Sequence, residues 1–240
     1  MTLYYEGDTW LHGLNPLVKL FSATAAVFTA GILASPGVLA LHLAFSLLLV
    51  LVAKPRLSRL IVAGALAAVA GQWWVNAALF HYNMGLPWAE ASWRGGLLAA
   101  RVAVVILYSV AFISTTSPRS LAVALSAQLR VPYVYSYMSF VTLRMLPLMA
   151  RDLENIRAAR RVRGYRGQGG PVSRLAGLLA PLLSVAVQRS VEMGIAMEAR
   201  GFGAYPDRSY VDPPRVTGGD MVFAGLVASV ILISIILYFF

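Results

Sequence analysis

Long apolar runs separated by short polar connections dominate this chain. An α-helix needs roughly 20 mostly apolar residues to cross a lipid bilayer. Five runs have that character, at residues 16–34, 37–53, 60–80, 96–116 and 221–240. The pattern therefore predicts an all-α polytopic membrane protein with about five transmembrane helices.

The segment between the fourth and fifth runs has a different periodicity. Apolar residues recur every three or four positions over residues 147–163, which is typical of an amphipathic helix. A second helix is expected over residues 174–200, with a kink near Pro181. We expect a coupling module of two or three amphipathic helices in the cytoplasm or at the inner leaflet.

Two apolar stretches in this segment could be mistaken for further spans. Residues 131–150 have arginines on both sides, so a crossing would place one basic cluster outside the cell. Residues 175–187 are too few to cross a bilayer. The expected organisation is a four-span membrane domain at 1–116, a coupling module at 117–220 and a last span at 221–240.

Composition narrows the class of protein. Hydrophobic residues make up 59% of the 240 residues and charged residues only 12%, against about 45–50% and 25% in soluble domains. This excludes a freely soluble enzyme. The chain has no cysteine, which removes disulfides and thiolate chemistry, and its three histidines are scattered. We therefore predict no catalytic residue and no metal site.

Positive charge predicts the orientation. Lys and Arg outnumber Asp and Glu by 20 to 10, and 14 arginines lie within residues 117–220. Because cytoplasmic segments are enriched in Lys and Arg, this segment and the N-terminus are expected in the cytoplasm and the C-terminus outside. The excess points to a lipid surface or an acidic protein partner rather than to nucleic acid.

The two amphipathic helices end alike. Each ends in a small or β-branched residue followed by Arg and Gly, and the two arginines are 37 residues apart: Val162-Arg163-Gly164 and Ala199-Arg200-Gly201. Glycine just past a helix end and arginine in the last turn are ordinary capping choices. Alternatively, each Arg projects from a helix tip and binds a carboxylate on a soluble partner through its planar fork. The residue pattern leaves both explanations open.

These motifs resemble the transmembrane T component of energy-coupling factor (ECF) transporters, the CbiQ/EcfT family. In that family two Ala-Arg-Gly or Ala-Arg-Ser motifs end the coupling helices. The second tripeptide matches fully, and the first has Val162 in place of Ala. The segment Leu11-His12-x-Leu14-Asn15-Pro16-x-Val18-Lys19-Leu20 is also similar to one that opens many members.

The resemblance implies a subunit of a prokaryotic cytoplasmic membrane that is not itself an enzyme and binds no cofactor. It would join two ATP-binding cassette ATPases, which bind the ATP, to a membrane-embedded S component that holds a vitamin or a transition metal. Arg163 and Arg200 would dock into the ATPases. The apolar faces of the coupling helices would transmit movement to the S component, through residues that include Leu146, Leu153 and Leu182.

Two other classes remain as alternatives. A membrane enzyme acting on phosphorylated lipids would suit the arginine-rich surface, but it usually needs a carboxylate cluster for metal or a nucleophile with its base. A scaffold that binds anionic lipids would also use the arginines. A scaffold gives no reason for the duplicated Arg-Gly helix ends.

Overall fold

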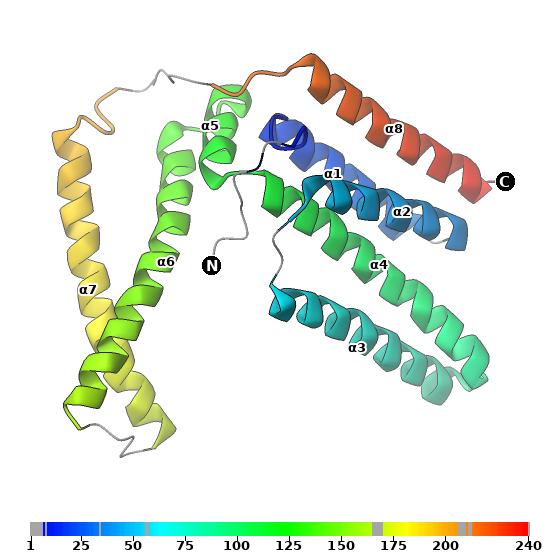
Figure 1. Cartoon of the computed structure of the whole chain (residues 1–240), viewed down its shortest axis with the longest axis horizontal. Coiled ribbons are helices and arrows are strands. Elements are labelled where there is room, and N and C mark those ends of the chain that lie inside the picture. Colours follow the sequence, from blue (N-terminus) through cyan, green and yellow to red (C-terminus); the bar gives the residue numbers. More distant parts are fainter. Residues whose placement is uncertain are drawn as a thin grey trace. The chain divides into compact units, whose positions relative to one another are not determined.

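A computed structural model describes residues 7, 9–33, 35–55, 58–164, 170–205, 210 and 213–239 of the chain. Every regular element in these ranges is an α-helix, which confirms the all-α fold class (Figure 1). The helices are α1 (Pro16–Ile32), α2 (Pro36–Ala53), α3 (Arg59–Met84), α4 (Trp88–Thr115), α5 (Pro118–Leu129), α6 (Tyr133–Val162), α7 (Pro171–Ala199) and α8 (Gly218–Phe239).

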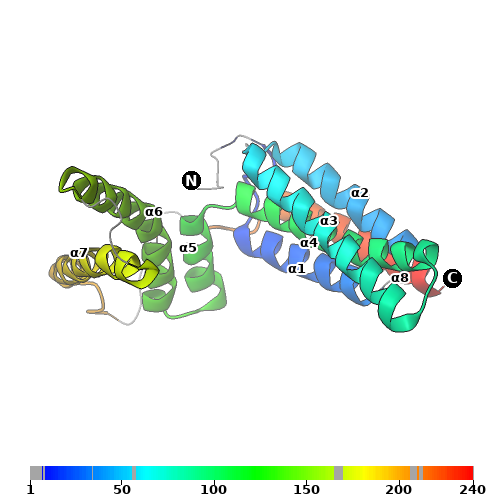
Figure 2. The same cartoon turned by 90° about the horizontal axis from the view of Figure 1, so that it is seen from below.

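The chain divides into two compact units. The bundle, residues 2–124 and 214–240, contains α1 to α4 and α8. Within it α4 packs against α1, α2 and α3, while α8 packs against α1 and α2 (Figures 1 and 2). The second unit, residues 125–213, contains α6 and α7, which we call the helix pair. The two Arg-Gly helix ends that the sequence predicts within residues 117–220 are the ends of α6 and α7 in the helix pair.

Five helical segments are long and apolar enough to cross a membrane, but they are not the five expected. α2, α3, α4 and α8 qualify, whereas α1 has only 17 residues. Leu175–Ala199 of α7 qualifies by length and composition. The sequence argument expected this helix over residues 174–200 but judged whether it could cross only from the uninterrupted apolar run at 175–187, so this segment was not counted.

The helix pair also begins earlier than the periodicity predicts. α6 starts at Tyr133 and continues through Pro147, so the expected start at residue 147 is wrong. Proline removes one backbone N–H and usually breaks or kinks a soluble helix. Here the residues before and after Pro147 both continue the apolar pattern, and a single helix of 30 residues results.

Local sequence explains where the bundle helices start and how closely they pack. Asn15 caps α1 by accepting a hydrogen bond from the Leu17 N–H, and Ser35 caps α2 in the same way through the Val38 N–H. Gly95 of α4 lies against α3, where a Cβ atom would come within 2.8 Å of the Ala77 nitrogen. Only glycine allows this backbone approach, a common device between membrane helices.

A buried polar chain joins three helices inside the bundle. His42 of α2 is fully buried, with Nδ1 3.2 Å from the Tyr108 hydroxyl of α4 and Nε2 3.2 Å from Ser234 Oγ of α8. Ser234 Oγ donates to the Val230 carbonyl, so it is free to accept from Nε2–H while Tyr108 donates to Nδ1. His42 is therefore a hydrogen-bonded packing residue between α2, α4 and α8.

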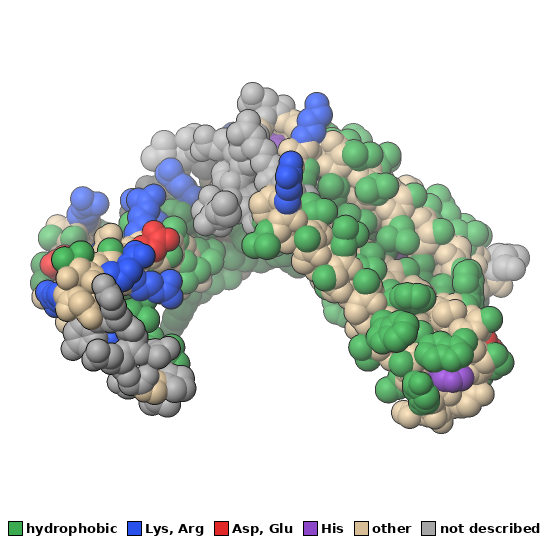
Figure 3. Space-filling view, turned by 60° about the horizontal axis from the view of Figure 1, so that its bottom comes forward, with side chains coloured by type: hydrophobic (Ala, Val, Ile, Leu, Met, Phe, Trp, Pro, Cys, Tyr) green, Lys and Arg blue, Asp and Glu red, His purple; other side chains and the backbone are tan. Residues whose placement is uncertain are grey.

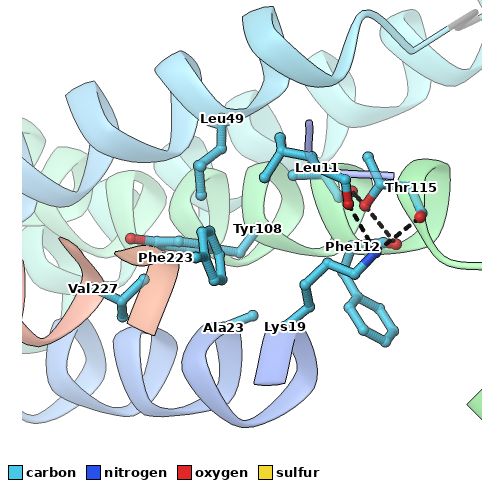
Figure 4. A pocket seen from close by; sticks show the side chains of 10 residues that line it. Leu11, Lys19, Ala23, Leu49, Tyr108, Phe112, Thr115, Phe223 and Val227 are labelled. Carbon is cyan, nitrogen blue, oxygen red and sulfur yellow. Dashed lines mark hydrogen bonds between the residues drawn. The ribbon is translucent and has the colours of Figure 1, made fainter. Parts of the chain in front are cut away.

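A second polar cluster ties together the ends of α1, α4 and α8. Lys19 Nζ donates to the carbonyls of Leu11 and Thr115 at 3.0 and 2.9 Å, beside a small pocket lined by α1, α2, α4 and α8 (Figure 4). Asp220, only 1% exposed, accepts hydrogen bonds from the Asn15 N–H, the Thr217 N–H and the Thr217 hydroxyl. The N-terminal segment at residues 11–20, which the sequence analysis singled out, therefore supplies hydrogen bonds that hold the ends of α1, α4 and α8 together.

Candidate coupling site

The helix pair consists of two antiparallel helices that cross (Figures 1 and 2). An ion pair links them where Arg189 Nη1 and Nη2 donate to the two carboxylate oxygens of Asp152 at 2.5 and 3.3 Å. The two side chains are 20% and 32% exposed for Asp152 and Arg189 respectively. This bidentate geometry fixes both the spacing and the register of the two helices.

The ion pair joins equivalent positions of the duplicated pattern. Asp152 and Arg189 are 37 residues apart, the same offset that separates Arg163 from Arg200. When two elements are related by a two-fold axis, the residue on the axis meets its own equivalent. Each arginine tip is 11 residues beyond the ion pair, or about 16 Å along an α-helix. The helix pair is thus a nearly two-fold crossing with equal arms.

The first tip ends α6. Arg163 is the C-cap residue, and its N–H donates to the Ala159 carbonyl at 3.1 Å. Gly164 follows with φ +77°, and its N–H donates to the Arg161 carbonyl at 3.1 Å. Val162 is 89% exposed, and the structure places Arg163 and Gly164 at the surface as well.

The second tip repeats this geometry at the end of α7. Arg200 is the C-cap residue and Gly201 has φ +71°. The Gly201 N–H donates to the Glu198 carbonyl at 2.9 Å, and the Phe202 N–H donates to the Met197 carbonyl at 2.9 Å. These two bonds form a Schellman motif, which requires the left-handed conformation that glycine adopts freely.

The left-handed cap explains both glycines, and the macrodipole favours a cation such as arginine at each helix end, so capping and a docking role for the arginines are compatible. A left-handed residue is needed after each helix, whatever the side chain before it does. Ala199, Arg200 and Gly201 are all exposed, like their counterparts at the first tip. Each tip accordingly presents a guanidinium group at a helix end with little side-chain bulk beside it.

Tyr133, which sequence reasoning did not single out, holds the loop after the second tip. Its hydroxyl accepts a hydrogen bond from the Gly203 N–H at 2.9 Å and donates to the Tyr205 carbonyl at 3.1 Å. The ring of Phe202 packs against Tyr133 and Tyr137, with centroid distances of 5.4 and 5.2 Å. A tyrosine just after Pro132 at a helix start gave no signal in the sequence that it would contact residues 70 positions away.

Apolar side chains outside the crossing are largely uncovered. Leu146 is 59% exposed, and Leu153 and Leu182 are half-buried. An open groove of about 300 Å³ lies between the first half of α6 and the second half of α7, and five methionines line it: Met138, Met145, Met149, Met193 and Met197. A row of exposed apolar residues follows α7 at every fourth position: Leu175, Leu179, Leu183, Val187, Val191 and Ile195.

Charge is distributed unevenly over the two units. On the face shown in Figure 3, Lys and Arg side chains concentrate over α6 and α7, and hydrophobic side chains cover much of the bundle. Within the described residues, no group of three or more His, Cys, Asp or Glu side chains could hold a metal ion. The exposed side chains of the helix pair are thus mainly positively charged and apolar.

Comparison with known proteins assigns the family. The family model for CbiQ, a cobalt transport protein, matches residues 7–211, which include both Arg-Gly tips and most of the bundle. The chain belongs to the CbiQ family. The resemblance carried by the N-terminal segment and the two helix ends is confirmed.

Several curated relatives of this CbiQ-family chain have the same description, energy-coupling factor transporter transmembrane protein EcfT. The protein from Leuconostoc gelidum subsp. gasicomitatum is 33% identical over 148 residues, 57% of this chain and 55% of that protein. The protein from Exiguobacterium sibiricum is 29% identical over 68% of this chain and 65% of its own length. The Clostridium kluyveri protein is 22% identical but covers 97% and 94%.

The family and the helices together define the class of protein. The CbiQ-family chain is a multi-pass membrane protein related to the T components of ECF transporters. The chain spans 55% of the length of the Leuconostoc relative and 65% of the length of the Exiguobacterium relative.

Proposed function

We propose that this chain is the T component of an ECF-type importer, coupling ATP hydrolysis by two cytoplasmic ATPases to movement of a substrate-binding S component. The observation that carries the proposal is the pair of exposed Arg-Gly tips, placed 11 residues on either side of a crossing that joins equivalent positions. A dimeric partner has two equivalent binding sites, which we call sockets, and a two-fold helix pair has two equivalent Arg-Gly tips to fill them.

The tip geometry suits an acidic socket. Arginine forms two parallel charge-assisted hydrogen bonds with a carboxylate, and the glycine that follows leaves room for a close backbone approach. Val162 in place of alanine adds two methyl groups beside the first guanidinium. The first socket must therefore be slightly wider than the second.

The uncovered apolar surface supports contact with a membrane-embedded partner. Soluble proteins usually bury rows of apolar side chains along a helix, whereas α7 leaves Leu175, Val187 and Ile195 more than half exposed. The S component and lipid acyl chains are the occupants that fit. Leu146, Leu153 and Leu182 lie on helices that would transmit movement to the S component, which carries the vitamin or transition-metal cargo.

The orientation belongs to the same proposal. The arginine-rich helix pair and the N-terminus lie in the cytoplasm of a prokaryotic cell and the C-terminus lies outside, with α7 at the inner leaflet rather than across the membrane. This orientation requires five crossings, so α1, whose 17 residues are at the lower end of the length range for a span, crosses together with α2, α3, α4 and α8. Because the chain has no cysteine, a single cysteine introduced near either end can be labelled specifically. A C-terminal cysteine that reacts with an impermeant maleimide only after cell lysis would contradict this orientation.

The docking proposal is tested by reversing charge at the tips. Arg163→Glu together with Arg200→Glu should lower the amount of ATPase that co-purifies with the chain in mild detergent more than tenfold and abolish uptake. Membrane insertion should not change, because both side chains are exposed. Arg151→Glu with Arg157→Glu is the matched control, since it makes the same charge change at exposed positions away from the tips.

The outcomes separate the candidate functions. Full ATPase retention and uptake by the tip variant would refute docking through the arginines. Equal losses in the tip variant and the control would instead indicate a general attraction between positive charge and an acidic surface such as anionic lipid. A purified chain that turned over lipid phosphates would support the enzymatic alternative.

A further inference from the structure

The loop that follows the second tip is held by the start of α6. After Arg200 the chain turns back to the start of α6, where the Tyr133 hydroxyl bonds to the backbone at Gly203 and Tyr205. A phenol has one proton to donate, and here it is donated to the Tyr205 carbonyl while the oxygen accepts from the Gly203 N–H. One side chain thus fixes the loop at two points.

The same contact reaches the helix end itself. Phe202 supplies the N–H that closes the end of α7 on the Met197 carbonyl, and its ring packs edge-on against Tyr133 with an interplanar angle of 80°. Arg200 is two residues before Phe202. Its backbone is therefore tied to α7 through the cap and to α6 through Tyr133, so the tip cannot swing without breaking one of these contacts.

We propose that Tyr133 is a positioning residue for Arg200. It holds the second tip in a fixed direction, so that the guanidinium group enters its socket with little loss of conformational freedom. An open groove of about 640 Å³ borders the tip, lined in part by Tyr137, Arg144 and Phe202, and it leaves room for the partner surface beside the arginine. This inference rests on the docking function proposed above.

The test combines Tyr133→Phe with the tip variants. Phenylalanine keeps the ring contacts with Phe202 and removes only the hydroxyl. The probe is the ATPase that co-purifies with the wild-type chain, purified again and titrated onto each variant in detergent. Tyr133→Phe should weaken binding about three- to tenfold, the range for the loss of one or two exposed hydrogen bonds. Tyr135→Phe, on a side chain that is 69% exposed, is the control and should bind like the wild type.

A double-mutant cycle separates positioning from a general structural effect. Tyr133→Phe should add nothing in the Arg200→Glu background, because the tip that it positions is already lost, and should add its full effect in the Arg163→Glu background. A spin label on Ala204→Cys should become more mobile in Tyr133→Phe and stay unchanged in Tyr135→Phe. No cysteine competes for this label.

The two proposals fail in different ways. Wild-type binding by Arg200→Glu would refute docking at this tip, and the role of Tyr133 would fall with it. If Arg200→Glu weakens binding while Tyr133→Phe does not, or if the two effects are fully additive, docking stands and the positioning role is wrong. The positioning role would also be overturned if the spin label at position 204 were no more mobile in Tyr133→Phe than in the chain with Tyr133.

Discussion

In the bundle, side chains as different as Ala26, Val104 and His42 are at most 2% exposed, whereas Ser136 is the one buried residue among the described side chains of α6 and α7. Some buried polar groups of the bundle pair internally, through the His42 chain and the Lys19 and Asp220 cluster. Asn15 Nδ2, Arg101 Nε and Thr116 Oγ1 are buried with no hydrogen-bond partner among the described residues. The Asp152–Arg189 ion pair links the two helices of the helix pair, and long rows of apolar side chains on them are uncovered. The bundle thus has a buried core of its own, whereas the helix pair leaves most of its described side chains uncovered.

The strongest way to break the bundle is to remove Asp220. Asp220→Ala leaves the N–H groups of Asn15 and Thr217 without their acceptor and the buried Lys19 without its nearby negative charge. We expect a loss of about 3–5 kcal/mol in unfolding free energy, the range for breaking a buried charged network. Thermal unfolding in detergent measures it. Glu90→Ala removes an acid that pairs with Arg94 at the surface and should change stability by less than about 0.5 kcal/mol.

A smaller loss is expected where α3 and α4 approach each other. Gly95→Val would push its side chain into the Ala77 and Trp73 backbone and force the helices apart, at a cost of about 1–3 kcal/mol. Gly71→Val is the control, because no atom lies within 4 Å of a Cβ atom at position 71. Equal unfolding temperatures for the two variants would show that the close approach does not matter for stability.

The smallest effect on stability is expected in the helix pair. Asp152→Arg or Arg189→Asp alone should cost about 1 kcal/mol or less, because the ion pair is partly exposed. Either change should nevertheless reduce uptake per ATP hydrolysed, since the crossing would lose its register. The exchanged double variant, Asp152→Arg with Arg189→Asp, should recover uptake, which a purely local charge effect would not produce.

The sequence revealed the fold better than it revealed the contacts. Hydrophobic run lengths predict α2, α3, α4 and α8, and the repeat of Arg and Gly at a 37-residue offset predicts both helix ends. The continuation of α6 through Pro147 was missed because the helix was bounded by the amphipathic periodicity at 147–163, whereas the residues before it are nearly all apolar and do not show that periodicity. Tyr133 was missed because its contacts lie 70 and 72 residues away, and no periodicity encodes such pairs.

The equal arms of the helix pair have a mechanical consequence. Two halves of a symmetric motor would displace the two tips by equal amounts. With 11 residues between each tip and the Asp152–Arg189 contact, equal displacements in opposite directions would turn the helix pair about the crossing without shifting it. The crossing would stay in place while both tips moved, so the motion that the helix pair transmits would be a rotation.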